Sequence, residues 1–221
     1  MRILALETST PTVSVALLDG EQLVGVRSDE VGAGASARIL PWAQELLAEA
    51  GWGPKDLDAV AASVGPGSFT GLRVGLATAK SLAWSADIAL IGESSLRTLA
   101  AHAANAPDRI VAAALDARRE QVYGAFFQGP DLTRLTDDTV CDPGQWAAEL
   151  AARPEAIAIG DGLARHPDVF GPDHPPVRPA AADLARLAAE AFKAGNCLDP
   201  RTAVPNYVRS HGATPPADMR G

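Results

Sequence analysis

The chain has 221 residues, of which 47% are hydrophobic and 21% are charged, and its formal net charge is −8. This composition is sufficient to bury a core and excludes an intrinsically disordered chain. The acidic balance argues against a protein that holds nucleic acid by itself, because such proteins usually present a basic face.

The sequence does not indicate a disulfide framework, secretion or membrane insertion. The two cysteines, Cys141 and Cys197, lie far apart and lack CxxC spacing, so neither disulfides nor a zinc site are expected. The N-terminus has no signal-peptide pattern, and no apolar run approaches the ~18 residues of a membrane span. We therefore expect a cytoplasmic protein with no membrane contact.

Sheet and helix patterns follow one another along the first half of the chain. Apolar runs bounded by turn residues predict strands over 2–6, 13–18, 22–27, 58–64 and 88–91. Apolar residues at helical spacing predict helices over 36–50, 70–84 and about 94–104. Ser36 is the expected cap of the first helix, Gly51 its end, and Ser94 or Ser95 the cap of the third.

A similar pattern begins again after a break at 105–108. Strands are predicted over 109–115, 121–128, about 132–140 and 156–159. Helices are predicted over 143–151 and about 181–194. Each half opens with a strand, a polar turn and a second strand. This predicts two α/β lobes over 1–104 and 105–210, followed by a disordered tail at 211–221.

The string GPGSFTGLRVG at 65–75 is the most informative part of the chain. Gly-Pro-Gly cannot lie inside a helix or a central strand, so the chain turns sharply here, and Ser68 and Thr70 are candidate caps of the next helix. Free backbone N–H groups and the helix dipole would point the same way and could accept an anion. The other interpretation is a purely structural turn between strand and helix.

Three segments of the chain resemble the TsaB (YeaZ) family. They are MRILALETSTPTVSVALLDG at 1–20, GPGSFTGLRVGLATAKSLA at 65–83 and ALDARREQVY at 114–123. Proteins of that family belong to the bacterial machinery that makes threonylcarbamoyl-adenosine in tRNA. The resemblance implies an α/β fold of two lobes of the actin-like ATPase (ASKHA, RNase H-like) type, with a degenerate cleft.

In that fold the turn after the first strand of each lobe faces a nucleotide cleft. The candidates for a vestigial cleft are Glu7, Thr8, Ser9, Gly65, Gly67, Asp116, Arg118, Gly160 and Gly162. The carboxylate and hydroxyls at 7–10 could hold magnesium or phosphate, or they could satisfy the amides of their own turn. Asp116 and Arg118 could pair with each other, or Arg118 could reach a phosphate or a partner carboxylate.

Metal ligands are missing where the catalytic relatives have them. The TsaD paralogue carries an HxxxH pair in this region, and two histidines four apart on a helix can chelate a metal. Counting from the shared GPG turn, Ser95 and Leu99 occupy those positions, and the four histidines of the chain have no such spacing. We expect neither a metal site nor autonomous protease activity, since a GxSxG motif is also missing.

The resemblance implies a non-catalytic subunit that works by association. It would order the metal-bearing TsaD-type paralogue, which transfers threonylcarbamoyl to the tRNA adenosine next to the anticodon. A TsaE-type ATPase would join the complex, tRNA would be reached only through it, and ATP or ADP could lie at its interface. The chain alone could form a homodimer through the same surface. The predicted contact residues are Ile39, Trp42, Ala43, Leu46, Arg73, Leu76 and Lys80.

Small residues at four-residue spacing mark the helix over 70–84. They are Gly71, Gly75, Ala79 and Ala83. Such a ridge lets another helix approach closely. It could serve packing inside this chain or a contact with a partner helix.

An enzyme of its own is the alternative function. A nucleotide-hydrolysing or kinase-like protein would use Glu7, Asp116 and the glycine turns at 65–67 and 160–162. Magnesium-dependent nucleotide affinity of the isolated chain would distinguish this alternative from a subunit that only associates.

Overall fold

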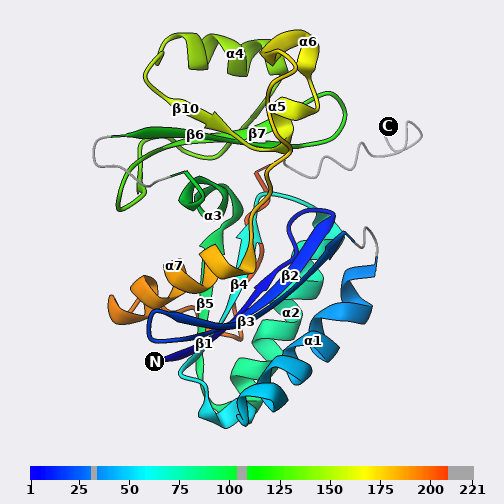
Figure 1. The fold of residues 1–221 in the computed structure, drawn as a ribbon, viewed down its shortest axis with the longest axis vertical. Coiled ribbons are helices and arrows are strands. Elements are labelled where there is room, and N and C mark those ends of the chain that lie inside the picture. Colours follow the sequence, from blue (N-terminus) through cyan, green and yellow to red (C-terminus); the bar gives the residue numbers. More distant parts are fainter. Residues whose placement is uncertain (31–33, 104–108, 209–221) are drawn as a thin grey trace, which may run out of the picture.

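The computed structural model describes residues 1–30, 34–103 and 109–208 and has two lobes, each built on one sheet (Figure 1). The lobes follow one another along the long axis of the molecule, with the first sheet at the bottom of the view and the second at the top. This is the two-lobed α/β arrangement that the repeated strand pattern predicts.

The first lobe contains a five-stranded mixed sheet. Its strands are β1 (Arg2–Glu7), β2 (Thr12–Asp19), β3 (Gln22–Glu30), β4 (Ala59–Gly65) and β5 (Ala89–Ser94). Their order is β3-β2-β1-β4-β5, in which β1, β2 and β3 are antiparallel while β4 and β5 run parallel to β1. The carboxyl ends of β1, β4 and β5 therefore lie at one edge, which faces the second lobe (Figure 1).

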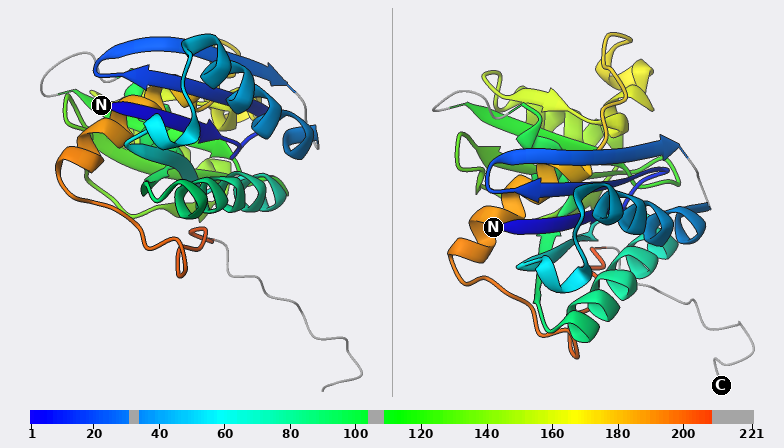
Figure 2. Two further views of the ribbon diagram at one scale, coloured as in Figure 1. Left: turned by 90° about the horizontal axis from the view of Figure 1, so that it is seen from below. Right: turned by 60° about the horizontal axis from the view of Figure 1, so that its bottom comes forward.

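Helices cover both faces of this sheet. Helices α1 (Ala35–Ala50) and α2 (Phe69–Ala86) pack on one face and α7 (Ala181–Lys193) on the other (Figure 2). Along β1 the side chains alternate accordingly, since Leu4 and Leu6 contact the α1/α2 core while Ile3 and Ala5 contact α7. A strand with both faces buried reads as a continuous apolar run, as β1 does. A short 3-10 turn at Pro54–Asp56 leads into β4.

The described part of the second lobe also contains a five-stranded sheet. Its strands are β6 (Ile110–Asp116), β7 (Val122–Gln128), β8 (Thr133–Arg134), β9 (Thr139–Cys141) and β10 (Ile157–Ile159). Strand β10 runs parallel to β6, and β7 lies antiparallel to β6 and pairs with both β8 and β9. Helix α3 (Ser95–Ala101) packs on one face, and α4 (Pro143–Ala151) packs on the other through Trp146 and Phe126.

Two short helices complete the described part of the second lobe. They are α5 (Asp161–Ala164) and α6 (Pro167–Phe170), which follow β10. The sequence analysis predicts no helix at either place, because four residues are too few for a helical apolar pattern.

The lobes are not the two consecutive halves that the sequence predicts. Helix α3 precedes the predicted boundary but packs against β6 and β7, and α7 lies in the second half but packs against β1, β2 and β5. The boundary at 104/105 and the predicted tail at 211–221 lie outside the described residues. Helical periodicity shows that α3 and α7 each have an apolar face, but it does not show which sheet will cover that face.

Most predicted elements match the structure within a few residues. The segment over 132–140 forms two short strands instead of one, because the Thr136 hydroxyl, and not a backbone carbonyl, accepts from Phe126 N (3.0 Å) between them. Ser68 and Ser94 cap α2 and α3 as predicted. The cap predicted at Ser36 is wrong, since α1 already begins at Ala35 after Gly34.

The ridge of small residues on α2 serves packing inside this chain. Gly71, Gly75, Ala79 and Ala83 are all buried. At Gly71 a Cβ would collide with the backbone carbonyl of Thr8, and at Gly75 it would collide with the Thr8 side chain. The Thr8 hydroxyl donates to Gly71 O (2.8 Å). The missing side chains therefore let α2 contact the turn that follows β1.

We expect Gly71→Ala to lower the free energy of unfolding by about 1–3 kcal/mol, because the obstructing atom is backbone and cannot move aside alone. Urea unfolding measures the change. Gly144→Ala is the matched control, since a Cβ there meets nothing within 4 Å, and it should leave stability unchanged or raise it by up to about 1 kcal/mol. Equal effects of the two substitutions would contradict the packing argument.

Candidate functional site

The carboxylate at the end of β1 points into the protein. Glu7 is fully buried, and its Oε1 accepts from Ser9 N (2.7 Å) while its Oε2 accepts from the Ser63 hydroxyl. Burial raises the pKa of the Glu7 carboxyl, an effect that the hydrogen bonds from Ser63 and Ser9 partly offset. Glu7 therefore joins β1 to β4 internally, which favours the structural interpretation of the turn after β1 over an open magnesium or phosphate site.

The glycine turn after β4 is held against the turn after β1. Ser68 N donates to Ser9 O (2.6 Å), and a Cβ on Gly67 would collide with that same carbonyl. Gly71 N donates to the capping Ser68 hydroxyl (3.2 Å). Two amides at the start of α2 are thus already bonded within the chain, so the structure supports the structural role of the GPG motif.

The corresponding turn of the second lobe, at 116–120, is built from left-handed residues. Arg118, Arg119 and Glu120 have φ values of 60°, 53° and 54°. Asp116 stabilises this turn, because its carboxylate accepts from Arg118 N (2.8 Å) and lies 3.6 Å from the Arg118 guanidinium. Of the two alternatives for these residues, the structure thus forms the pair between Asp116 and Arg118.

A glycine turn also lies against the first strand of the second lobe. Gly160 and Gly162 flank Asp161 directly after β10, and a Cβ on Gly160 would collide with the carbonyl of Ala114. This close approach lets Asp161 Oδ1 accept from Asp116 N (3.1 Å). The predicted cleft residues of the second lobe are therefore brought together, and they are engaged with one another.

An arginine that the sequence analysis did not single out lies between the two lobes. Arg178 Nε donates to Asp161 Oδ2 (2.8 Å), and its Nη1 donates to Thr12 Oγ1 (2.9 Å) and lies 3.0 Å from Glu30 Oε1. Burial opposes the charge, but these contacts raise the pKa of the guanidinium above its usual range. A single arginine in a proline-rich loop gives no sequence signal for this role.

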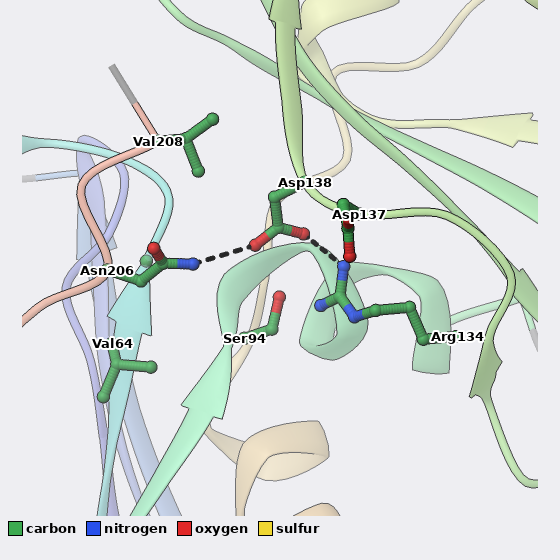
Figure 3. Close-up of a pocket in the computed structure, with 8 residues that line it drawn as sticks. Val64, Ser94, Arg134, Asp137, Asp138, Asn206 and Val208 are labelled. Atoms are coloured by element: carbon green, nitrogen blue, oxygen red, sulfur yellow. Dashed lines mark hydrogen bonds and ion pairs between the residues drawn. The ribbon is translucent and has the colours of Figure 1, made fainter. Parts of the chain in front are cut away.

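A cavity of about 420 Å³ lies at the opposite end of the junction, over the carboxyl ends of β4 and β5 (Figure 3). Its lining residues are Val64, Gly65, Ser94, Arg134, Asp137, Asp138, Asn206 and Val208. Asp138 lies between Arg134 and Asn206 Nδ2 (3.2 Å), and burial raises the pKa of its carboxyl. The cavity is thus lined by both lobes and by the C-terminal segment.

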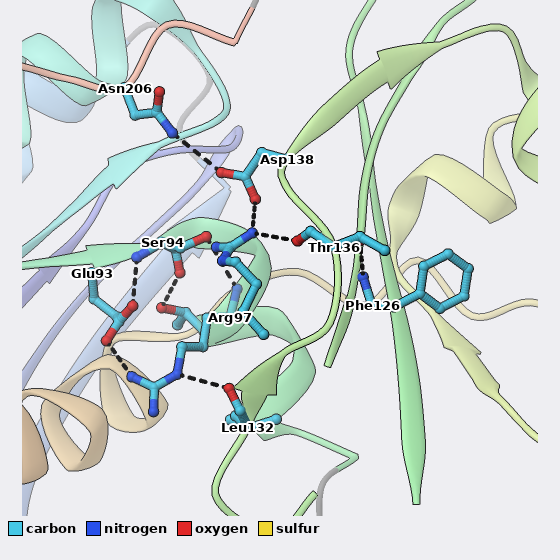
Figure 4. A network of polar contacts seen from close by, with 10 residues as sticks. Glu93, Ser94, Arg97, Phe126, Leu132, Thr136, Asp138 and Asn206 are labelled. Atoms are coloured by element: carbon cyan, nitrogen blue, oxygen red, sulfur yellow. Dashed lines mark hydrogen bonds and ion pairs between the residues drawn. The ribbon is translucent and has the colours of Figure 1, made fainter. Parts of the chain in front are cut away.

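Polar contacts around α3 connect the first sheet to the second on this side (Figure 4). Arg97 on α3 pairs with Glu93 at the end of β5 (2.6 Å). Its guanidinium also donates to the carbonyls of Leu132 (3.3 Å) and Asp131 (3.1 Å), beside β8. The contacts of Arg97 therefore run from one lobe to the other.

The predicted partner surface needs correction. Five of its residues are core residues with at most 9% exposure: Ile39, Trp42, Ala43, Leu46 and Leu76. They form the inner faces of α1 and α2, because the apolar stripe of a helix packs first against its own sheet. These side chains cannot meet a partner on the folded chain.

The two remaining residues of that prediction hold the C-terminal segment, residues 198–208. Lys80 Nζ donates to Ala203 O (2.9 Å), and Arg73 Nε donates to the Tyr207 hydroxyl (2.8 Å). The Arg73 guanidinium also lies 3.7 Å from the centre of the Phe69 ring. Both cations thus contact this chain's own C-terminal residues.

The described residues offer neither a metal cluster nor a helix able to span a membrane. Within the described residues, no three His, Cys, Asp or Glu side chains are placed to hold a metal ion together. Across the same ranges, none of the helices combines the length and the hydropathy needed to cross a bilayer.

Comparisons with known proteins identify relatives over almost the whole chain. A family model described as TsaD, tRNA N6-adenosine threonylcarbamoyltransferase, matches residues 21–165. The tRNA threonylcarbamoyladenosine biosynthesis protein TsaB of Bacillus subtilis is 39% identical, with 95% of this chain and 94% of that protein covered. The TsaB of Escherichia coli is 32% identical, with 96% of each covered. The solved structure of YeaZ from Pseudomonas aeruginosa is similar to this chain with a TM-score of 0.80 and 30% identity, and the match covers 93% of this chain and 99% of that one.

The sheet order and the two meeting turns define a two-lobed α/β protein of the actin-like, RNase H-like fold class. In each lobe a hairpin is followed by a helix and a strand parallel to the first, and a glycine turn then lies against the hairpin. Together with its relatives, this places the chain in the TsaB (YeaZ) family.

The buried Glu7 carboxylate should make stability depend on pH. Because its pKa is raised in the folded protein above its ordinary value of about 4.5, the folded state keeps the proton longer than the unfolded state, and stability is lost as pH rises through the folded pKa. We expect Glu7→Gln to remove this decrease in the free energy of unfolding with rising pH. Urea unfolding of the parent chain and of the variant between about pH 5 and 8 measures the two pH dependences. If the free energies of unfolding of the two proteins differ by the same amount at every pH, the prediction is wrong.

Proposed function

We propose that this chain serves tRNA threonylcarbamoyladenosine biosynthesis as a non-catalytic subunit that binds and orders a TsaD-type paralogue. Membership of the TsaB family supports the pathway. The observation that supports the subunit role is that the polar groups at the cleft form hydrogen bonds within this chain. The Glu7 carboxylate is buried, and Asp116 and Asp161 are bonded to groups of the same lobe. Because these polar groups are hydrogen-bonded within the chain, we expect the chain to act through its surface and not through a catalytic cleft.

The outer faces of α1 and α2 are the surface that we assign to the partner. The two helices lie side by side on one face of the first sheet (Figure 2). Their outward positions include exposed alanines at Ala48 and Ala77, and large apolar side chains project at Leu40 (43% exposed) and Trp84 (68%). Small residues let another helix approach closely, and the exposed apolar side chains supply area to bury.

Further components belong to the same proposal. A TsaE-type ATPase joins through the complex, tRNA is held by the complex and not by this acidic chain, and ATP or ADP can lie at the subunit junction. A homodimer through the α1/α2 faces is the state expected for the chain alone, because related chains can share one isologous surface.

Light scattering coupled to size-exclusion chromatography tests the proposal. The chain is run alone and mixed with the TsaD-type paralogue from the same genome, and threonylcarbamoyl transfer to tRNA is assayed for each sample. A one-to-one complex with activity above that of either component is expected. Failure to associate, together with magnesium-dependent nucleotide turnover by this chain alone, would favour the kinase-like alternative.

A single substitution tests the assigned surface. Ala77→Arg places a long cation on the outward face of α2 and should weaken the complex with the paralogue by about tenfold or more, since a close helix contact cannot accommodate it. Ala148→Arg is the matched control, because Ala148 is an exposed helical alanine on α4 in the other lobe. Titration calorimetry measures both; equal affinities for the two variants would exclude this surface.

A further inference from the structure

Arg178 lies where the chain returns from the second lobe to the first. It occupies the stretch between α6 and α7, and three residues later Ala181 N donates to the Ser14 hydroxyl on β2 (2.9 Å). The backbone next to Arg178 is therefore fixed to the first lobe. From this position the side chain reaches across to Asp161 in the second lobe.

The partners of Arg178 on the first lobe form one cross-strand pair. Thr12 at the start of β2 lies directly opposite Glu30 at the end of β3, and both contact Nη1. On the other side, the Asp161 carboxylate that accepts from Nε is itself held by Asp116 N on β6. A continuous series of polar contacts thus runs from β2 and β3 through one guanidinium to β6.

We propose that Arg178 is a latch that fixes the orientation of the two lobes without any bound ligand. A planar guanidinium presents its donors in a fixed geometry, so bonds from Nε to one lobe and from Nη1 to the other define the relative orientation of their partners. The side chains of Arg178 and Asp161 are only 22% and 11% exposed, so water screens this pair less than it screens a surface ion pair.

The sheet topology determines where opening would occur. Arg178 binds at the β3/β2 end of the first sheet, whereas the Glu93–Arg97 and Asn206–Asp138 contacts lie at its β4/β5 end. With the latch removed, the contacts at the β4/β5 end remain. The lobes would then separate at the β3/β2 end and turn about the α3 side.

Distances between spin labels on the two lobes test the latch. Labels are attached at Glu21→Cys, in the exposed β2–β3 turn, and at Glu155→Cys, exposed in the second lobe, after Cys141 and Cys197 are replaced by serine in the full chain. Double electron–electron resonance should give one narrow distance population with Arg178 present. In Arg178→Gln the distribution should broaden and gain a second, shifted population.

Matched variants separate the latch from a general loss of structure. Arg201→Gln also removes an arginine–carboxylate pair, but that pair is exposed and local, so the distance distribution should not change. Arg178→Lys keeps the charge without the planar fork and should give intermediate broadening. Combining Asp161→Asn with Arg178→Gln should add no broadening beyond Arg178→Gln, because both remove one interaction.

Each measured distance distribution either supports or contradicts the latch. An unchanged distribution in Arg178→Gln, or equal broadening in Arg201→Gln, would overturn the latch. If Arg178→Gln does not fold by circular dichroism, Arg178→Lys decides instead, since it keeps the charge but not the planar fork that contacts Asp161, Thr12 and Glu30. Broadening in Arg178→Lys supports the latch, and its absence overturns it.

Discussion

Both lobes depend on the close approach of a glycine-containing turn to the end of the first strand. In the first lobe the turn after β4 contacts the carbonyl of Ser9 and the first turn of α2 contacts the carbonyl of Thr8, while in the second lobe the turn after β10 contacts the carbonyl of Ala114. A Cβ at these places would meet backbone atoms, so no side chain can be accommodated without moving a strand. This constraint brings each hairpin turn and each glycine turn into one layer at the lobe junction.

The carboxylates of Glu7 and Asp161 in that layer accept hydrogen bonds from neighbouring groups of this chain. Glu7 accepts from a backbone amide and a hydroxyl, and Asp161 accepts from Asp116 N on one oxygen and from Arg178 on the other. A buried carboxylate is costly unless its oxygens are hydrogen-bonded, and here each oxygen has a partner.

The two lobes are connected by exchanged elements as well as by these contacts. Helix α3 follows β5 but packs on the second sheet, and α7 follows the second sheet but packs on the first. The C-terminal segment then bonds to β4 and α2 and reaches Asp138 through Asn206. The lobes are thus held at both ends of the junction, by Arg178 at β3/β2 and by α3 with the C-terminal segment at β4/β5.

The sequence by itself determined most of the elements, the sharp turn at 65–67 and the helix caps at Ser68 and Ser94, because these depend on local patterns. Through the resemblance of specific strings it also determined the family and the fold class. Only the tertiary structure decided what those elements contact. The sequence analysis assigned Ile39 and Leu46 to a partner surface, because periodicity marks an apolar helix face without showing what covers that face. In the structure the first sheet covers the apolar face of α1. Arg178 meets Thr12 and Asp161 across 166 and 17 residues of chain, and contacts at such separations leave no local pattern to read.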